Sequence, residues 1–352
     1  MPDELPDGLA WLGPPPRPKQ GEVIALLVTR NEALRLPAAL AHLRAQGVGR
    51  AYVIDNQSSD ATRDIVAAQD WVHLMHAPGS YAGSNYGITW TNAVLDRFAR
   101  NHWVLVVDAD ELLVYPSCQT CNLQTLCGHL DKIGAEAFRT ILLDCFPQGP
   151  LHGVRYASGD DLTAAAPFFE APLLRAEPVP NFPYEQQYGG LRERLFFHEA
   201  DPARLLRRLH QKAWNAGVKL GIAQHMQRLA PRRSPTVTKL PLIFWREGAA
   251  LLSSTHQLAP MRLAADQPSG VLLHFKFLQD FHQRAVDAVS RGAHFDGSRE
   301  YRRYLAAMAR APEFGLHGWR SLRYEGADQL VALGLMHDSM GWVAARRPAG
   351  CG

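Results

Sequence analysis

Three carboxylates follow one apolar run at close spacing. Residues 103–107 are apolar and rich in valine, and Asp108, Asp110 and Glu111 come directly after them. Such a run predicts a strand buried on both faces, as in a parallel sheet. Crowded acids repel one another and raise each other's pKa, so a bound divalent cation is the easiest explanation for all three. In the simpler alternative, Asp110 and Glu111 cap the following turn or pair with surface arginines, since Asp-X-Asp is common by chance.

The surroundings of the acids favour the metal hypothesis. A second apolar segment, residues 112–116, follows them. The acids are therefore expected at an edge between two buried segments rather than on a solvated helix face. Open α/β sheets bind ligands outside the carboxyl ends of their strands, which is where the first segment ends.

Alternating strands and helices are predicted before this edge. Apolar runs indicate buried strands over residues 23–29, 51–54 and 72–75. Between them, Pro37 suits a first helical turn, Gly47 suits a left-handed C-terminal position, and Ser59 or Asp60 can cap the next helix. Four such alternations with short connections predict an α/β fold with a doubly wound, mostly parallel central sheet and helices on both faces.

The glycine motifs of other nucleotide-binding folds are missing from the sequence. No Gly-X-Gly-X-X-Gly follows the first strand, and no Gly-Lys-Ser/Thr of the P-loop type occurs anywhere. Dinucleotide and P-loop chemistry are therefore disfavoured. Nucleotide binding through acids and a metal ion remains.

Five segments resemble family 2 glycosyltransferases. Three of them are similar, in order and spacing, to the nucleotide-sugar half of the GT-A fold, and two later ones are similar to a bacterial branch of the family. The segments are 28–32 (Val-Thr-Arg-Asn-Glu), 53–62 (Val-Ile-Asp-Asn-Gln-Ser-Ser-Asp-Ala-Thr), 106–111 (Val-Val-Asp-Ala-Asp-Glu), 189–194 (Gly-Gly-Leu-Arg-Glu-Arg) and 273–276 (Leu-His-Phe-Lys). The resemblance covers most of residues 23–304, and the three early loops together are more specific than any one of them.

The resemblance implies a GT-A domain over residues 21–300, with a nucleotide-binding half at 21–116 and an acceptor half at 117–300. The proline-rich residues 1–20 are expected to form an extended leader, and residues 301–352 a helical C-terminal extension and tail. The implied reaction is a metal-dependent, inverting transfer by direct displacement. A hexose would pass from a nucleotide-sugar donor to a hydroxyl of a carbohydrate or glycoconjugate acceptor, in polysaccharide biosynthesis.

The matching segments supply the expected donor-binding residues. Those expected to bind the nucleotide are Thr29, Arg30, Asn31, Glu32, Asp55, Asn56 and Asp108. Those expected to bind the diphosphate or the acceptor are Arg192, Arg194 and Lys276.

Asp110 is expected to bind the metal directly, with Asp108 at the ribose or close behind the ion and His274 as a further ligand. Oxygen ligands suit Mg²⁺ or Mn²⁺, and one imidazole favours Mn²⁺. A metal here would bridge the diphosphate and stabilise the charge on the leaving nucleotide. In the alternative, His274 is a core histidine whose hydrogen bonds are satisfied.

A general base is needed to take the proton of the acceptor hydroxyl. Glu193, after the flexible Gly189-Gly190 pair, is the leading candidate, and Asp144 is the substitute. Because Arg192 and Arg194 flank Glu193, they could lower its pKa and weaken it as a base. Glu193 would then instead position the two arginines on the diphosphate.

Composition limits the classes of partner. The chain of 352 residues is 20% charged and 47% hydrophobic, with a formal net charge of +3, too small to indicate a nucleic-acid partner. No apolar run is long enough to span a membrane, and the start lacks a signal peptide, so a cytoplasmic protein is expected. Five cysteines fit reduced thiols. Zinc at Cys118, Cys121 and Cys127 is the weaker alternative, because no fourth ligand stands nearby.

One basic segment leaves a peripheral membrane contact open. Arg204, Arg207, Arg208 and Lys212 have helical spacing, which is typical of a solvated face but also suits anionic lipid or a charged acceptor.

Two rival functions remain open as well. A nucleotidyltransferase would want a glycine-rich loop after the first strand, which is absent, and an inactive nucleotide- or carbohydrate-binding protein need not have kept the acids.

Overall fold

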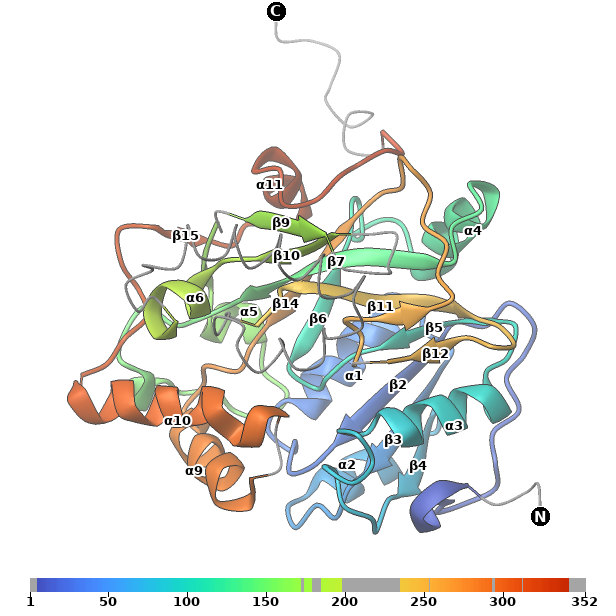
Figure 1. Cartoon of the computed structure of the whole chain (residues 1–352), viewed down its shortest axis with the longest axis horizontal. Coiled ribbons are helices and arrows are strands. Elements are labelled where there is room, and N and C mark those ends of the chain that lie inside the picture. Colours follow the sequence, from blue (N-terminus) through green and yellow to red (C-terminus); the bar gives the residue numbers. More distant parts are fainter. Residues whose placement is uncertain are drawn as a thin grey trace, which may run out of the picture. The chain divides into compact units, whose positions relative to one another are not determined.

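A nine-stranded mixed sheet flanked by helices forms the core of the computed structural model (Figure 1). The structure describes residues 5–171, 174–178, 185–197, 235–252, 254–292, 295–311 and 313–341. Within them the strand order of this sheet is β1-β4-β3-β2-β5-β11-β7-β14-β6. The predicted α/β class with a doubly wound sheet is confirmed.

Four parallel strands form the first half of the sheet. They and the helices that join them are β2 (Ile24–Thr29), α1 (Leu36–Ala45), β3 (Arg50–Asp55), α2 (Thr62–Ala67), β4 (Val72–His76), α3 (Ile88–Phe98) and β5 (His102–Val106). Each strand matches its prediction to within one residue at either end. Pro37 lies in the first turn of α1, and Asp60 accepts a hydrogen bond from the backbone N–H of Thr62 at the start of α2. The local signals were therefore sufficient for this half.

Strands distant in the sequence complete the sheet. They are β6 (Glu111–Val114), β7 (Ala137–Asp144), β11 (Thr238–Trp245) and β14 (Gly270–His274). β11 runs antiparallel between β5 and β7, while β14 runs parallel to β7 and antiparallel to β6. It follows that β2, β3, β4, β5, β7 and β14 all end at one edge, where β6 and β11 begin. This edge is called the ligand edge below.

The chain ends also contribute to the fold. Residues of the expected leader form η1 (Pro6–Gly8) and β1 (Ala10–Trp11), and β1 pairs antiparallel with β4. The Trp11 ring packs edge-on against Tyr52 and Phe98, so this part of the leader covers the border of the sheet. Near the other end, α10 (Phe295–Arg310) continues across the boundary expected between residues 300 and 301 and packs on α9 (Phe281–Arg291).

Further helices and strands accompany this sheet. They are α4 (Leu123–Lys132), η2 (Leu151–Gly153), α5 (Leu162–Ala165), β8 (Phe168–Glu170), β12 (Ala250–Leu251), β13 (Leu258–Ala259), β15 (Ser321–Arg323) and α11 (Ala327–Ala332). In the part of the chain that the structure describes, no helix is long and apolar enough to cross a bilayer.

The chain divides into two compact units. The first comprises Met1–Ala171 and Val237–Gly352, and the second is Pro172–Thr236. Within the second, β9 (Arg175–Pro178) pairs antiparallel with β10 (Glu185–Tyr188), and α6 (Leu191–Phe196) follows. The basic segment from Arg204 to Lys212 lies outside the described residues.

Candidate active site

Lys239, from β11, neutralises two of the three acids that follow β5. Its Nζ atom lies 3.3 Å from Oδ2 of Asp108 and donates a hydrogen bond to Oε1 of Glu111. Burial lowers the pKa of Lys239, but the two carboxylates outweigh burial and raise it, so the ammonium group stays charged. Lys239 therefore supplies a positive charge to Asp108 and Glu111. The expectation that a divalent cation binds at these acids stays a prediction.

His274 lies between two buried carboxylates. Its Nδ1 atom lies 2.7 Å from Oδ1 of Asp144, and its Nε2 atom lies 3.6 Å from Oδ2 of Asp110. The sheet register produces this arrangement, because His274 is the partner of Asp144 on β7 and of Glu111 on β6. A carboxylate at Nδ1 fixes the tautomer and the orientation of the ring, which leaves Nε2 facing Asp110.

Asp144 is therefore a positioning residue. Its side chain is 4% exposed and already bonded to an imidazole, so it is not free to take a proton from an acceptor hydroxyl. The assignment of Asp144 as the substitute base stays a prediction, which its pairing with His274 disfavours.

Arg284, on α9, joins Glu32 and Asp110. Its Nη2 atom lies 2.7 Å from Oε1 of Glu32 and 3.8 Å from Oδ2 of Asp110. Burial raises the pKa of Glu32 to about 7, with Arg284 opposing the shift and Asp110 adding to it. Burial also raises the pKa of Asp110, but the charges of His274 and Arg284 reverse this and bring it below its ordinary value. Asp110 is therefore ionised, and the charges of Arg284, Arg35 and Lys276 act on its carboxylate.

Arg35 fastens the segment that follows His274. Its fully buried guanidinium donates from Nε to the carbonyl of Phe275 at 3.0 Å and makes two bonds of 2.6 Å to Asp280. These bonds tie α1 to the stretch between β14 and α9. Both His274 and Arg284 are held in place in this way.

Lys276 is enclosed by α10. Its Nζ atom lies 3.4 Å from Oε1 of Glu300 and 5.2 and 5.0 Å from the ring centroids of Tyr301 and Tyr304. A diphosphate would therefore have to compete with Glu300 for this ammonium group. The assignment of Lys276 to the diphosphate stays a prediction.

Asp110 and His274 suit a divalent metal, since they bring together a carboxylate oxygen and an imidazole nitrogen that is supported from behind by Asp144. Among the described residues, no group of three His, Cys, Asp or Glu side chains is placed to hold a metal ion. Diphosphate oxygens and water would therefore have to complete the coordination, as they commonly do for Mg²⁺. Zinc at Cys118, Cys121 and Cys127 gains no support from the same residues, and these three cysteines form no disulfide bond with one another.

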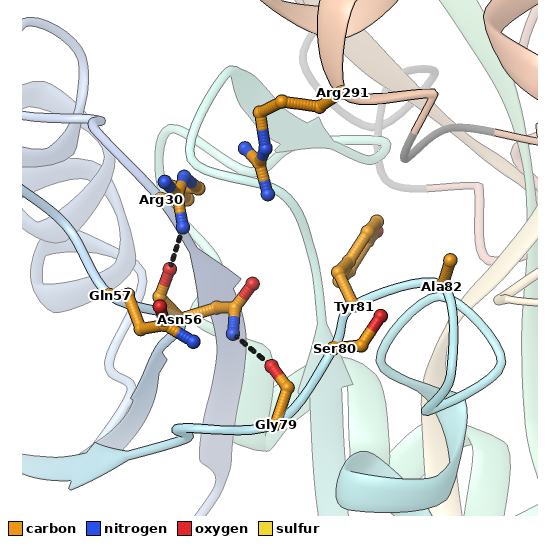
Figure 2. Close-up of a pocket in the computed structure, with 8 residues that line it drawn as sticks. All are labelled: Arg30, Asn56, Gln57, Gly79, Ser80, Tyr81, Ala82 and Arg291. Atoms are coloured by element: carbon orange, nitrogen blue, oxygen red, sulfur yellow. Dashed lines mark hydrogen bonds between the residues drawn. The ribbon is translucent and has the colours of Figure 1, made fainter.

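A cavity of about 340 Å³ opens at the ligand edge beside β2, β3 and β4 (Figure 2). The residues that line it are Arg30, Asn56, Gln57, Gly79, Ser80, Tyr81, Ala82 and Arg291. Figure 2 shows both guanidinium groups and the Tyr81 ring around the same space. Burial and the neighbouring charge of Arg30 lower the pKa of Arg291. With two arginines and no carboxylate, this lining suits an anionic ligand.

Asn56 holds the walls of the cavity together. Its Nδ2 atom donates to the backbone carbonyls of Ala77 and Gly79, both at 2.9 Å. The backbone carbonyl of Asn56 accepts a hydrogen bond from Arg30 at 2.9 Å. Asn31, with a left-handed φ of 53°, accepts a hydrogen bond from the backbone of Ser59. Arg30 and Asn56 thus line the cavity, while Asn31 connects the loop after β2 to the loop after β3.

Two other expected nucleotide-binding residues lie below the surface. Asp55 is 0% exposed and accepts hydrogen bonds from Nε of Arg63 at 2.6 Å and from the backbone of Ser58 at 3.2 Å. The buried carboxylate is thus bonded to Arg63 of α2 and to the loop after β3, and the expected contact of Asp55 with the nucleotide stays a prediction. Thr29 is also buried, and its carbonyl accepts from the backbone of Asn56.

Glu193 belongs to the second unit, whereas Asp108, Asp110 and Glu111 belong to the first. Its carboxylate accepts hydrogen bonds of 2.6 and 2.9 Å from Arg175, a partner that the sequence did not indicate. Gly190 precedes α6 with φ of 88°, a conformation that favours glycine, while Arg192 is buried and Arg194 half-buried. The catalytic assignment of Glu193 stays a prediction.

Comparison with known proteins assigns no family. No family model and no curated protein matches the chain. A crystal structure of 4-diphosphocytidyl-2C-methyl-D-erythritol synthase is 17% identical, with 53% of this chain and 85% of that chain covered and a TM-score of 0.26. A crystal structure of HddC from Yersinia pseudotuberculosis is 10% identical, with 40% and 70% covered and a TM-score of 0.24. Likenesses this weak carry no argument about function.

Proposed function

We propose that this protein is a glycosyltransferase that moves a sugar from a nucleotide-sugar donor to a hydroxyl of a carbohydrate or glycoconjugate acceptor. The observation that carries the proposal is the position of Asp110 and His274 at the same sheet edge as the arginine-lined cavity. Asp110 and His274 suit a metal ion that binds a diphosphate. The cavity suits the other parts of the nucleotide. The resemblance of the loop sequences to family 2 glycosyltransferases supports the same function.

The cavity would receive the nucleotide. The Tyr81 ring offers a flat surface for a base, and the side chains of Asn56 and Gln57 lie beside it. Arg30 and Arg291 would attract the negative charge of the phosphates, because no carboxylate lines the cavity to compete.

Asp110 and His274 would hold Mn²⁺ or Mg²⁺, which supplies charge stabilisation to the leaving diphosphate when bound. Asp144 keeps Nε2 of His274 turned toward Asp110. Arg284 adds a positive charge nearby, since its guanidinium lies between Glu32 and Asp110. The chain thereby pre-organises positive charge where negative charge would develop.

Glu193 would act as the base. The acceptor oxygen forms a bond to the anomeric carbon while the bond from that carbon to the diphosphate oxygen breaks, and Glu193 takes the hydroxyl proton. To accept that proton, Glu193 must give up part of its pairing with Arg175.

A screen of nucleotide sugars for metal-dependent hydrolysis tests the proposal, because this side reaction needs no acceptor. The wild-type chain should release a nucleoside diphosphate only when Mn²⁺ or Mg²⁺ is added, and Asp110→Asn should abolish the release. Arg30→Gln and Arg291→Gln should raise KM, whereas Arg310→Gln, exposed at the end of α10, is the matched control.

Three results would contradict this function. Undiminished turnover in the presence of a chelator would remove the metal. Pyrophosphate release from a nucleoside triphosphate and a sugar phosphate would indicate nucleotidyl transfer instead. Nucleotide binding without any turnover would indicate an inactive binding protein.

A further inference from the structure

The most exposed large apolar side chain that the structure describes stands at the tip of a turn. Trp319 is 89% exposed, and Leu322, three residues later, is 36% exposed. The turn precedes β15, which lies in the first unit and pairs with β8. A tryptophan in this position loses contact with water only when another surface covers it.

The turn holds Trp319 rigidly. The backbone N–H of Ser321 donates to the carbonyl of Gly318 at 3.0 Å, and the Ser321 hydroxyl accepts from the Gly318 N–H at 2.9 Å. Downstream, Leu322 pairs with Phe169 in the register of β15 and β8, and Tyr324 donates to the carbonyl of Pro167 at 2.7 Å. Little conformational entropy would therefore be lost when the tip is buried.

Two arginines accompany the exposed ring. The Arg320 guanidinium lies 4.8 Å from the Trp319 ring centroid, and that of Arg323 lies 5.9 Å from the Phe168 ring. Residues 314–324 contain no Asp or Glu, and Glu313 and Glu325 directly flank them. The turn itself therefore combines an exposed indole with two arginines. It is called the Trp319 turn below.

We propose that the Trp319 turn docks on an anionic lipid surface. Indole rings prefer the boundary between lipid headgroups and acyl chains, and nearby arginines are attracted to anionic headgroups. A sugar or other small ligand prefers a concave site, and a protein partner needs a larger apolar patch than one Trp and one Leu. An anionic bilayer thus suits both the exposed indole and the two arginines of the turn.

Flotation of the full-length chain with vesicles tests this inference. Vesicles of phosphatidylcholine and phosphatidylglycerol in equal parts should bind the protein, and vesicles of phosphatidylcholine alone should bind it much less. Added salt should weaken the binding, because it screens the arginines. We expect Trp319→Ala to abolish flotation, and Arg320→Gln and Arg323→Gln each to lower the partition coefficient about fivefold.

Leu333→Ala is the matched control, since Leu333 is an exposed apolar residue at the end of α11 and outside the turn. Thermal unfolding of each variant should match the wild type, because the exchanged side chains are exposed. Absence of wild-type flotation would overturn the inference, as would flotation that the Trp319 and arginine variants leave unchanged. Loss of binding to an oligosaccharide by Trp319→Ala, with vesicle binding intact, would assign the turn to an acceptor instead. None of these measurements depends on the proposed transferase activity.

Discussion

Oδ1 of Asp144 lies 2.7 Å from Nδ1 of His274, although 130 residues separate the two along the chain. The contact arises because β7 and β14 pair in parallel with these two residues in register at their carboxyl ends. Since Asp144 occupies one ring nitrogen, only Nε2 is available on the side of Asp110. The geometry of the proposed metal site thus depends on a carboxylate that would not itself touch the metal.

Asp144→Asn should therefore weaken metal binding without unfolding the protein. Loss of a carboxylate behind a metal-bound histidine typically costs 10- to 100-fold in affinity, so we expect Mn²⁺ affinity to fall by roughly that factor. Titration calorimetry with Mn²⁺ and uridine diphosphate measures it. Asp266→Asn is the control, because Asp266 makes a 2.8 Å contact with His337 at the surface. If the two variants bind Mn²⁺ equally well, the positioning role of Asp144 is wrong.

The parallel half of the sheet could be predicted because its signals are local. Apolar runs, Pro37 at a helix start and Asp60 just before the next helix all act within a few residues. The placement of Asp108, Asp110 and Glu111 at the end of β5 followed from the same patterns. These local patterns did not indicate which side chains pair with the acids.

Those partners come from strands and helices far along the chain. The sequence did indicate a partner for Lys239, because a charged residue within the largely apolar stretch 237–245 requires a buried partner. Nothing in the sequence around Arg284 or Arg175 distinguishes them from other arginines on amphipathic elements. The insertion of β11 antiparallel between β5 and β7 was equally unpredictable, because strand pairing across this distance leaves no local pattern.

Lys239→Met should destabilise the fold strongly. The variant leaves Glu111, whose side chain is 1% exposed, without the ammonium group that faces it. Removing one partner of a buried ion pair typically costs about 3–5 kcal/mol, and urea denaturation should show a loss of that order. Lys132→Met, at an exposed position in α4, is the control. Adding Glu111→Gln to Lys239→Met should recover part of the loss. No recovery would mean that the pair is not coupled.

Glu32 should make stability depend on pH. Burial raises its pKa from an ordinary value of 4.5 to about 7, so between these values the folded chain retains a proton that the unfolded chain has released. The stability that Glu32 contributes is therefore complete below 4.5 and is lost as the pH rises through about 7. The full difference amounts to roughly 3 kcal/mol.

Chemical denaturation of Glu32→Gln across this interval measures the effect. Because the amide does not titrate, the decrease in unfolding free energy with rising pH should be smaller in Glu32→Gln than in the wild type. Glu247→Gln should keep the wild-type slope, because the Glu247 side chain is 86% exposed. Identical slopes for wild type and Glu32→Gln would show that the pKa of Glu32 is not raised.

Glu193→Gln should separate a base from a positioning group. The amide keeps the shape of the side chain and can still accept a hydrogen bond from Arg175, but it cannot take a proton. If Glu193 is the base, donor affinity stays normal and turnover falls at least ~10²-fold. Arg175→Gln is the companion variant, because it removes the charged donor that faces the Glu193 carboxylate. Its turnover should persist, with the pH optimum displaced upward, since an arginine no longer stabilises the ionised form. Loss of donor affinity in Glu193→Gln, with turnover intact at saturation, would instead show that Glu193 arranges Arg192 and Arg194 on the diphosphate.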